Sequence, residues 1–320
     1  MKPALSVVLV TDRYETIRLV LACLNVQSVR ESIEVVIVIP SDHAAEIPAA
    51  DQLSFHSLNV VEVESIRPMP PARAAGVRAS KAGIIFIGET HSFPHPQFAA
   101  EIIAAHNGPW DIVVPGLENA NPESPKSWSA FVLDYGYWMS GLSAAVIANG
   151  PTWNASYKRE LLLSLGDRLD TVLSSGDDLP MELRSRRHTV YFQPRARIDH
   201  SNVEVGGWAD ERFLSGRVVG ANRSRRWSWM KRGFYLMASP LIPVVLLYRT
   251  TPSIRVLIRE GSMPSGSIAA IIAGLFIRTL GEAAGYIAGI SPEEEQRMEN
   301  YELHKLKSVR RVRGAAEAFA

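Results

Sequence analysis

The segment from Pro71 to Pro96 places a carboxylate and an imidazole directly after a short apolar run. The run is Ile84 to Ile87, and Gly88-Glu89-Thr90-His91 follows it. Consecutive bulky apolar residues are typical of a buried strand, and the stretch before them predicts a short helix. Because open α/β sheets bind ligands at the carboxyl ends of their strands, Glu89 and His91 are candidate site residues.

Similar apolar runs occur elsewhere in the first half of the chain. Ser6 to Val10 and Glu34 to Ile39 predict buried parallel strands, and the apolar spacing of Glu15 to Gln27 predicts a helix between them. Strand, helix and strand in this order imply a right-handed crossover in an α/β sheet. We also expect strands at Leu58 to Val63 and Ile112 to Pro115, and a helix at Gln97 to His106.

Length and charge limit the function classes. A chain of 320 residues can bury one sizeable core and carry an appended element. The formal net charge of +1 gives no reason to expect nucleic acid as a partner.

Cys23 is the single cysteine, which excludes an internal disulfide, and its apolar surroundings predict a small buried side chain. The apolar run Val7 to Val10 is too short for a secretory signal, so we expect activity on the cytosolic side.

The segment around Ile84 resembles the inverting family 2 glycosyltransferases of the GT-A fold. In that family an Ala-Arg-Asn-x-Gly helix precedes a strand that ends in an acidic motif, and here Ala72-Arg73-Ala74-Ala75-Gly76 precedes Glu89-Thr90-His91. The latter is close to a Glu-Asp-His variant of the family's Asp-x-Asp motif.

Three later blocks follow in the family's order. Asn154 to Leu162 is similar to an Asn-x-x-x-Arg-Arg segment, Gly176 to Arg184 to a Glu-Asp-x-x-Leu-x-x-Arg segment, and Val190 to His200 to its closing strand. The resemblance covers roughly Ser6 to His200. It implies an α/β fold with a mixed, mostly parallel sheet flanked by helices, in a glycosyltransferase domain of residues 1–215. For residues 216–320 we expect a helical, membrane-associated region on the grounds of composition given below.

The resemblance also implies a metal site. Glu89 and His91 would hold a divalent cation, Mn²⁺ or Mg²⁺, on the diphosphate of a nucleoside-diphosphate sugar, and His200 matches a family position that faces the diphosphate or its metal. The alternative for each histidine is an ordinary hydrogen-bonded residue after a strand.

By the same resemblance, Asp178 is the base that takes the proton from the acceptor hydroxyl during inversion, and Asp177 orients its loop. The alternative is that these acids cap the amino terminus of a helix. Both roles are compatible.

Four residues are candidates for contacts to the nucleotide. Asp12 and Thr11 follow the first strand, and Arg73 is the motif arginine. After its second strand the family commonly has acids that grip the base or ribose, whereas this chain has Ile39-Pro40-Ser41 with Asp42 displaced. Uridine specificity is therefore not implied, and capping or salt-bridge roles remain alternatives.

The composition changes after His200. Basic residues and tryptophans between Arg217 and Lys231 precede the apolar run Phe234 to Tyr248, and a second apolar segment covers Ser265 to Ile290. Within it Gly274, Arg278, Gly281 and Gly285 share one helical face that suits close packing. Neither run supplies a clean span of about 20 apolar residues. We expect a helical hairpin that lies in or dips into the cytoplasmic leaflet, with a soluble helical cap as the alternative. The tail from Glu293 turns from acidic to basic, which favours attraction to anionic lipid.

The resemblance, together with the apolar and basic segments after His200, implies an inverting glycosyltransferase. It would move a sugar from a nucleoside-diphosphate donor to a lipid-linked, polysaccharide or cell-envelope acceptor at the cytoplasmic membrane face. Homo-oligomer formation is left open. One alternative is a catalytically impaired relative that acts as a membrane-bound scaffold or partner subunit, favoured by Thr90 and by the missing acids near Ile39. A sugar nucleotidyltransferase is disfavoured, because Leu9 to Glu15 lacks a glycine-rich phosphate loop.

Overall fold

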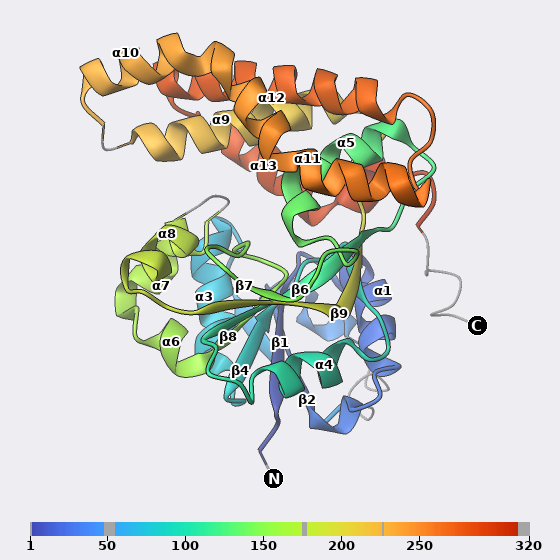
Figure 1. Cartoon of the computed structure of the whole chain (residues 1–320). Coiled ribbons are helices and arrows are strands. Elements are labelled where there is room, and N and C mark those ends of the chain that lie inside the picture. The colour runs from blue at the N-terminus through green and yellow to red at the C-terminus, as the bar shows by residue number, and fades with distance from the viewer. Residues whose placement is uncertain (1, 48–54, 175–177, 226, 313–320) are drawn as a thin grey trace. The chain divides into compact units, whose positions relative to one another are not determined.

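The computed structural model describes residues 2–47, 55–174, 178–225 and 227–312 (Figure 1). By their contacts these residues form two compact units. The first contains the chain up to Glu118 and Ser143–Asp199, and the second contains Asn119–Leu142 and the chain from His200 onward. The expected domain boundary after residue 215 stays a prediction.

The described strands form one sheet in the order β3-β2-β1-β4-β8-β6-β9-β5, with β7 paired to β9. Strands β1 to β4 are mutually parallel where they pair, and β8 is antiparallel to both β4 and β6. The bounds are β1 Leu5–Val10, β2 Ile33–Pro40, β3 Ser57–Val63, β4 Ile84–Ile87, β5 Ser92–Pro94, β6 Ile112–Asn119, β7 Ala145–Ile147, β8 Ala155–Lys158 and β9 Val190–His200.

Helices of the first unit cover both faces of this sheet. Gly76 of α3 lies against Val8, whereas Phe98 of α4 makes an edge contact with Phe86 at 4.9 Å between ring centres. Val8 pairs with Ile87, so Val8 and Phe86 point to opposite faces. The helices of this unit are α1 Tyr14–Asn25, α3 Met69–Ala79, α4 Phe98–Ala105, α6 Arg159–Leu163, α7 Leu169–Val172 and α8 Asp178–Ser185.

The core of this unit explains why the early strands are nearly unbroken apolar runs. All six residues of β1 are buried, as are the first seven of β2. Burial on both faces requires such runs. Glu34 is the charged exception within β2, and its carboxylate accepts hydrogen bonds from the Ser6 hydroxyl at 2.5 Å and the Lys81 amide at 2.7 Å. The predicted strands and helices of this region are confirmed to within a few residues, and Cys23 is buried as expected.

Strand register brings several segments to one edge of the sheet. Val8 of β1 is level with Ile87 of β4 in a parallel pair, so Thr11 and Gly88 leave the sheet at the same edge. Ile87 is also level with Ala155 of the antiparallel strand β8, and the Asn154 amide donates to the Ile87 carbonyl at 2.8 Å. Residues that follow β1 and β4 therefore lie at the same edge as the residue that precedes β8.

The described part of the second unit is helical. Gly281 and Gly285 of α12 contact the backbone of α9, and Gly274 lies against Ser129 and Leu133 of α5. The predicted close-packing face of small residues is thereby confirmed. Its helices are α5 Pro125–Tyr135, α9 Trp208–Ser224, α10 Trp229–Ala238, α11 Ile242–Glu260, α12 Ser267–Ala288 and α13 Pro292–Leu303.

Two segments of this unit are long and apolar enough to cross a membrane by length and composition. They are Trp229–Glu260, which comprises α10 and α11 with the short turn between them, and Ser267–Ala288. Only 28% and 39% of their most apolar windows are buried. Two such helices are weak evidence for a membrane protein, but this low burial is unlike that of a core helix.

Candidate functional site

Glu89 lies two residues beyond the carboxyl end of β4 and is buried. Its Oε2 accepts a hydrogen bond from the Ser92 hydroxyl at 3.1 Å and one from the Asn154 side-chain amide at 2.5 Å. Two donors from different segments thus fix one oxygen of this carboxylate. A carboxylate oxygen is a ligand type that divalent cations accept.

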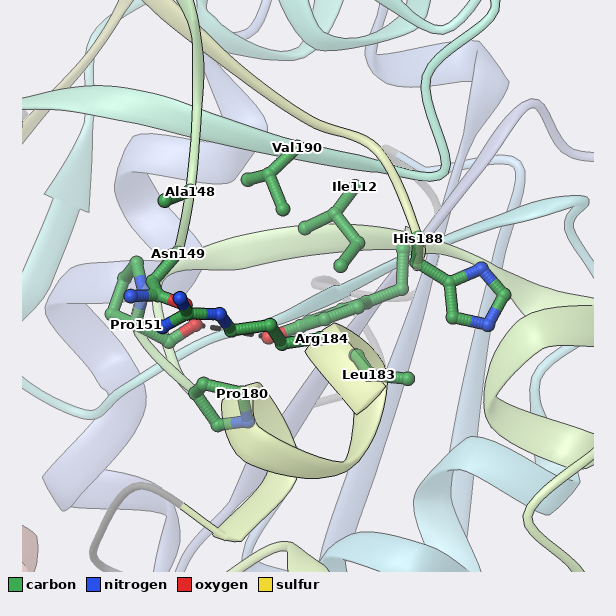
Figure 2. A pocket seen from close by; sticks show the side chains of 11 residues that line it. Ile112, Ala148, Asn149, Pro151, Pro180, Leu183, Arg184, His188 and Val190 are labelled. Atoms are coloured by element: carbon green, nitrogen blue, oxygen red, sulfur yellow. Dashed lines mark hydrogen bonds between the residues drawn. The ribbon is translucent and has the colours of Figure 1, made fainter. Parts of the chain in front are cut away.

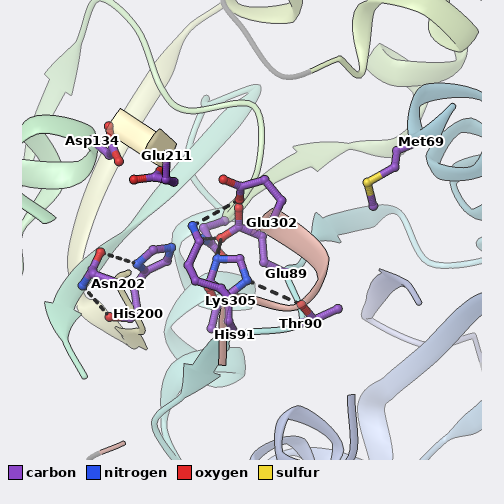
Figure 3. A network of polar contacts seen from close by, with 12 residues as sticks. Met69, Glu89, Thr90, His91, Asp134, His200, Asn202, Glu211, Glu302 and Lys305 are labelled. Carbon is purple, nitrogen blue, oxygen red and sulfur yellow. Dashed lines mark hydrogen bonds and ion pairs between the residues drawn. The ribbon is translucent and has the colours of Figure 1, made fainter. Parts of the chain in front are cut away.

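His91 shares this place with Glu89 (Figure 3). Its Nε2 lies 3.4 Å from Glu89 Oε2, and its Nδ1 lies 3.5 Å from the Thr90 hydroxyl. Both side chains are buried in the first unit. An oxygen and a nitrogen donor side by side are a mixed set that Mn²⁺ accepts. The structure therefore brings together two of the three predicted metal ligands within this unit.

Asn154 contacts the candidate metal ligand Glu89, and the sequence did not reveal this contact. Its φ of 52° lies in the left-handed region, and its side chain is fully buried. This backbone places the residue directly before β8, where its side-chain amide reaches Glu89. Asn154 begins one of the family-like blocks, which is the only signal in the sequence, because the contact joins residues 65 positions apart.

Arg73 is buried within α3 rather than displayed on a surface. One Nη donates to the Leu173 carbonyl at 2.9 Å, and the guanidinium carbon lies 4.1 Å from the centre of the Trp153 ring. These two contacts link α3 to two other segments of the first unit. The expected nucleotide contact of Arg73 stays a prediction.

The other candidate nucleotide residues differ in their surroundings. Thr11 is buried, and its hydroxyl donates to the Arg13 carbonyl at 2.8 Å. Asp12 accepts a hydrogen bond from the Thr16 hydroxyl at 3.0 Å near the start of α1. Asp42 is exposed and lies 3.7 Å from the His43 imidazole. Thr11 and Asp12 follow β1, at the same edge as Glu89.

Asp178 is the first described residue of α8, and its carboxylate accepts a hydrogen bond from the Ser174 hydroxyl at 2.8 Å. It is partly exposed. Its roles as a helix cap and as the base both stay predictions. Asp177 lies outside the described residues.

His200 is the last residue of β9 and belongs by its contacts to the second unit. Its Nδ1 lies 3.0 Å from the Asn202 side-chain oxygen (Figure 3), and its ring centre lies 4.3 Å from that of Tyr135. The imidazole is buried. Its role as a metal ligand stays a prediction.

A second group of acidic and imidazole side chains lies in the first unit. Donor atoms of His95, Glu118 and Asp199 lie within 4.8 Å of one another. His95 Nε2 is 3.2 Å from Asp199, which raises the pKa of the imidazole, and Arg197 lies 3.3 Å from Glu118. Asp199 therefore has an imidazole partner and Glu118 a guanidinium partner within the protein, as in an ordinary polar network.

The first unit also contains a small pocket beside α8 (Figure 2). Its lining is largely apolar, including Ile112, Leu183 and Val190, with Arg184 and His188 as the basic groups. None of the candidate site residues lines it. The pocket gives no support to a donor site.

Comparisons with known proteins support the fold. No family model matches the chain, and no curated protein matches it. A mannosyltransferase from Pyrobaculum calidifontis, solved with GDP-mannose and Mn²⁺, matches at 17% identity over 90% of this chain and 86% of that one, with a TM-score of 0.52. The TarS fragment 1–349 of S. aureus matches at 15% identity over 91% and 93%, but with a TM-score of 0.44 no conclusion is drawn from it. The likeness to the mannosyltransferase confirms the predicted GT-A-like fold, a mixed, mostly parallel sheet flanked by helices. At 17% identity it shows the fold alone.

Proposed function

We propose that the protein is an inverting glycosyltransferase, which moves a sugar from a nucleoside-diphosphate donor to a lipid-linked, polysaccharide or cell-envelope acceptor at the cytoplasmic membrane face. The observation that carries this proposal is the buried Glu89–His91 pair at the carboxyl edge of the sheet, 3.4 Å between Oε2 and Nε2. In an α/β sheet this edge is where ligands bind. The GT-A-like fold adds support, since glycosyltransferases share it.

The pair suits a divalent cation in its chemistry. Glu89 offers a carboxylate oxygen and His91 an imidazole nitrogen, and the Asn154 side-chain oxygen is buried with no hydrogen-bond partner among the described residues. We assign Glu89 and His91, with His200 as the third residue, to hold Mn²⁺ or Mg²⁺. When bound, such an ion neutralises charge on the donor diphosphate as the sugar leaves.

The donor nucleotide would lie beside the ends of the neighbouring parallel strands. Thr11 and Asp12 follow β1 at the same edge as Glu89, and Asp42 follows β2, which is parallel to β1. Asp12 and Asp42 supply acceptors that suit ribose or base hydrogen-bond donors. Arg73 would act at the diphosphate or, as its contacts favour, by holding nearby segments.

Asp178 would act as the general base. Inversion needs one ionised carboxylate that accepts the proton of the acceptor hydroxyl while the new bond forms on the face opposite the leaving group. Its hydrogen bond from the Ser174 hydroxyl fixes the direction of the carboxylate. Asp177 would orient this segment.

Release of nucleoside diphosphate from a panel of nucleoside-diphosphate sugars, measured with Mn²⁺ or Mg²⁺, tests the proposal. Asp178→Asn should lower turnover about 10²- to 10⁴-fold while donor binding stays within about twofold. Asp170→Asn is the matched control, because Asp170 pairs with Arg78 at a partly exposed position. Donor binding without turnover in the unaltered protein would instead favour the impaired scaffold, and no binding of any donor would overturn the proposal.

A further inference from the structure

Helix α12 exposes a continuous apolar stripe. We define the α12 stripe as Ile268, Ile272, Phe276, Leu280 and Ile287, whose side chains are 40% to 65% exposed. The other exposed residues of α12 are alanines, and its charged residues, Arg278 and Glu282, are not exposed. A surface helix in water normally carries polar residues on its outer face, so this face is suited to an apolar environment.

The stripe is long as well as apolar. Its members recur mainly every four residues, which keeps them on one side of the helix. From Ile268 to Ile287 the helix rises by about 28 Å, at 1.5 Å per residue. That length is close to the roughly 30 Å hydrocarbon thickness of a bilayer, so the stripe alone would allow either a spanning or an in-plane helix.

A second apolar surface covers α10, α11 and the short turn between them. We define the α10–α11 patch as Phe234, Met237, Leu241, Val244 and Tyr248, whose side chains are 63% to 81% exposed. Trp229 and Met230 extend it at the start of α10. Exposed apolar area on this scale marks an interaction site rather than scattered surface residues.

The opposite side of α12 distinguishes the spanning from the in-plane arrangement. Helix α9 runs alongside it in the same direction, with Trp208 next to Gly274 and the Ser224 hydroxyl near the Gly285 carbonyl. The two backbones approach so closely that a Cβ added to Gly281 would lie 1.9 Å from the Phe213 carbonyl oxygen. If α12 entered a membrane, α9 would therefore have to enter it as well.

Helix α9 is too polar to enter the hydrocarbon core. It carries Asp210, Glu211, Arg212, Arg217 and Arg223 within 17 residues. Arg223 pairs with Glu282 of α12 at 2.9 Å and is itself exposed, and Arg217 pairs with Glu294 of α13. Charged residues at the bilayer centre cost several kcal/mol each, so a spanning α12 would be strongly opposed by its companion.

Charge points to the nature of the surface that covers the stripe and the patch. Residues 227–290 contain six cationic side chains, Lys231, Arg232, Arg249, Arg255, Arg259 and Arg278, against two acids, Glu260 and Glu282. Four of the cations are exposed, namely Lys231, Arg249, Arg255 and Arg259. Of the two acids Glu260 is exposed and Glu282 is buried, so the exposed charge is still mainly positive. Each exposed cation near an anionic leaflet contributes about 1 kcal/mol. Trp229 and Tyr248 are the aromatic types enriched at headgroup level.

We infer that α10, α11 and α12 lie in the plane of an anionic phospholipid leaflet, with the α12 stripe and the α10–α11 patch in the acyl boundary and no helix crossing the bilayer. This inference rests on the membrane part of the proposed function and is independent of glycosyl transfer. It goes beyond the expected leaflet hairpin, because it assigns α12 an in-plane orientation and names the lipid charge that holds it.

Vesicle flotation of the full chain tests the docking surface. The protein should float with phosphatidylglycerol-containing vesicles and at least about tenfold less with phosphatidylcholine vesicles or in high salt, because the cations are screened. The double variant Phe276→Glu, Leu280→Glu should lose flotation, whereas Val146→Glu, at a 62% exposed position of β7 in the first unit, should keep it. The inference would be overturned if the double variant floated as well as the unaltered protein. It would also be overturned if the unaltered protein were a soluble dimer that binds no vesicles and if the double variant were a monomer. Circular dichroism of each variant verifies folding.

Labelling with a membrane-impermeant maleimide tests the orientation. In a Cys23→Ala background, Ser265→Cys marks the turn before α12 and Glu295→Cys marks α13 after it, and both positions are exposed. An in-plane α12 predicts that both cysteines react from the cytoplasmic side only. Reaction of the two from opposite sides would show a spanning helix and overturn the inference. Neither experiment uses a donor or acceptor, so absence of glycosyl transfer would leave both results unchanged.

Discussion

The guanidinium of Arg73 lies 4.1 Å from the centre of the Trp153 ring and donates to the Leu173 carbonyl at 2.9 Å. Trp153 precedes Asn154, whose amide holds Glu89, and Leu173 precedes Ser174, whose hydroxyl holds Asp178. One buried side chain therefore connects the supports of the candidate metal ligand and of the candidate base. Arg73 is in this sense a positioning residue.

Arg73→Lys should lower the free energy of unfolding by about 1–3 kcal/mol, because lysine keeps the charge but loses the planar stacking surface and the fixed donor geometry. Turnover should fall more than KM rises, since both supports loosen. Denaturant unfolding and steady-state kinetics measure these effects. Arg78→Lys on the same helix is the control, because Arg78 pairs with Asp170 at the surface and should change stability by less than about 1 kcal/mol. Equal effects of the two variants would contradict the role of Arg73.

Two substitutions of Asn154 distinguish the effect of its side-chain amide on metal binding from the effect of its backbone conformation on stability. Asn154→Gly and Asn154→Ala both remove the hydrogen bond to Glu89, so both should weaken Mn²⁺ binding, measured by electron paramagnetic resonance, by about 10- to 100-fold. Alanine should in addition be less stable than glycine by about 1 kcal/mol, because the φ of 52° strains a residue with a Cβ. Unaltered Mn²⁺ affinity in the glycine variant would show that the amide does not orient Glu89.

The contact of α9 with α12 predicts a large difference between two glycine substitutions. A Cβ at Gly281 would lie 1.9 Å from a backbone oxygen of α9, so Gly281→Ala should destabilise the protein by about 1–3 kcal/mol or more. Gly233→Ala in α10 meets nothing within 4 Å and should be neutral or stabilising by up to about 1 kcal/mol. Thermal unfolding of the pair tests this, and similar melting temperatures would argue against the close approach.

His106 predicts a pH dependence of stability. Burial, together with nearby Lys158 and against the opposing effect of Asp111, lowers the pKa of its imidazole from 6.5 to about 4. Protons then bind preferentially to the unfolded chain. The contribution of the neutral His106 imidazole to the free energy of unfolding is therefore fully present above pH 6.5, and it is lost as the pH falls from there through the pKa of the folded state. The loss is on the order of 3 kcal/mol. Urea titrations between pH 7 and pH 4 should show this slope flattened in His106→Gln, which can keep the hydrogen bond to Ser156. An unchanged slope would exclude His106 as its source.

The sequence predicted the elements whose signal is local. Buried strands β1, β2 and β4 are apolar runs, and the glycines of α12 recur on one helical face, so both could be recognised without knowing their neighbours. Strand β6 extends to Asn119, beyond the predicted end at Pro115, because pairing in the sheet outweighs the weak strand preference of its last residues.

Contacts between residues far apart in the chain could not be predicted from local sequence patterns. Asn154 meets Glu89 and Arg73 meets Leu173 only because strand pairing and helix packing bring segments 65 and 100 positions apart together. For the same reason periodicity alone could not tell that Ile271 of α12 is buried while its neighbour Ile272 is 40% exposed. The side of a helix that faces the protein is decided by its packing partners.

Calorimetric binding of GDP and UDP, with Mn²⁺ and with a chelator, tests the central claim most directly. The account predicts that Mn²⁺ tightens binding of at least one nucleotide by about tenfold or more, that Glu89→Gln loses this enhancement, and that Glu101→Gln on α4 keeps it. Binding of both nucleotides that is equally strong with chelator, or a Glu89→Gln variant that keeps the full enhancement, would contradict the assignment of Glu89 and His91 as the donor's cation site.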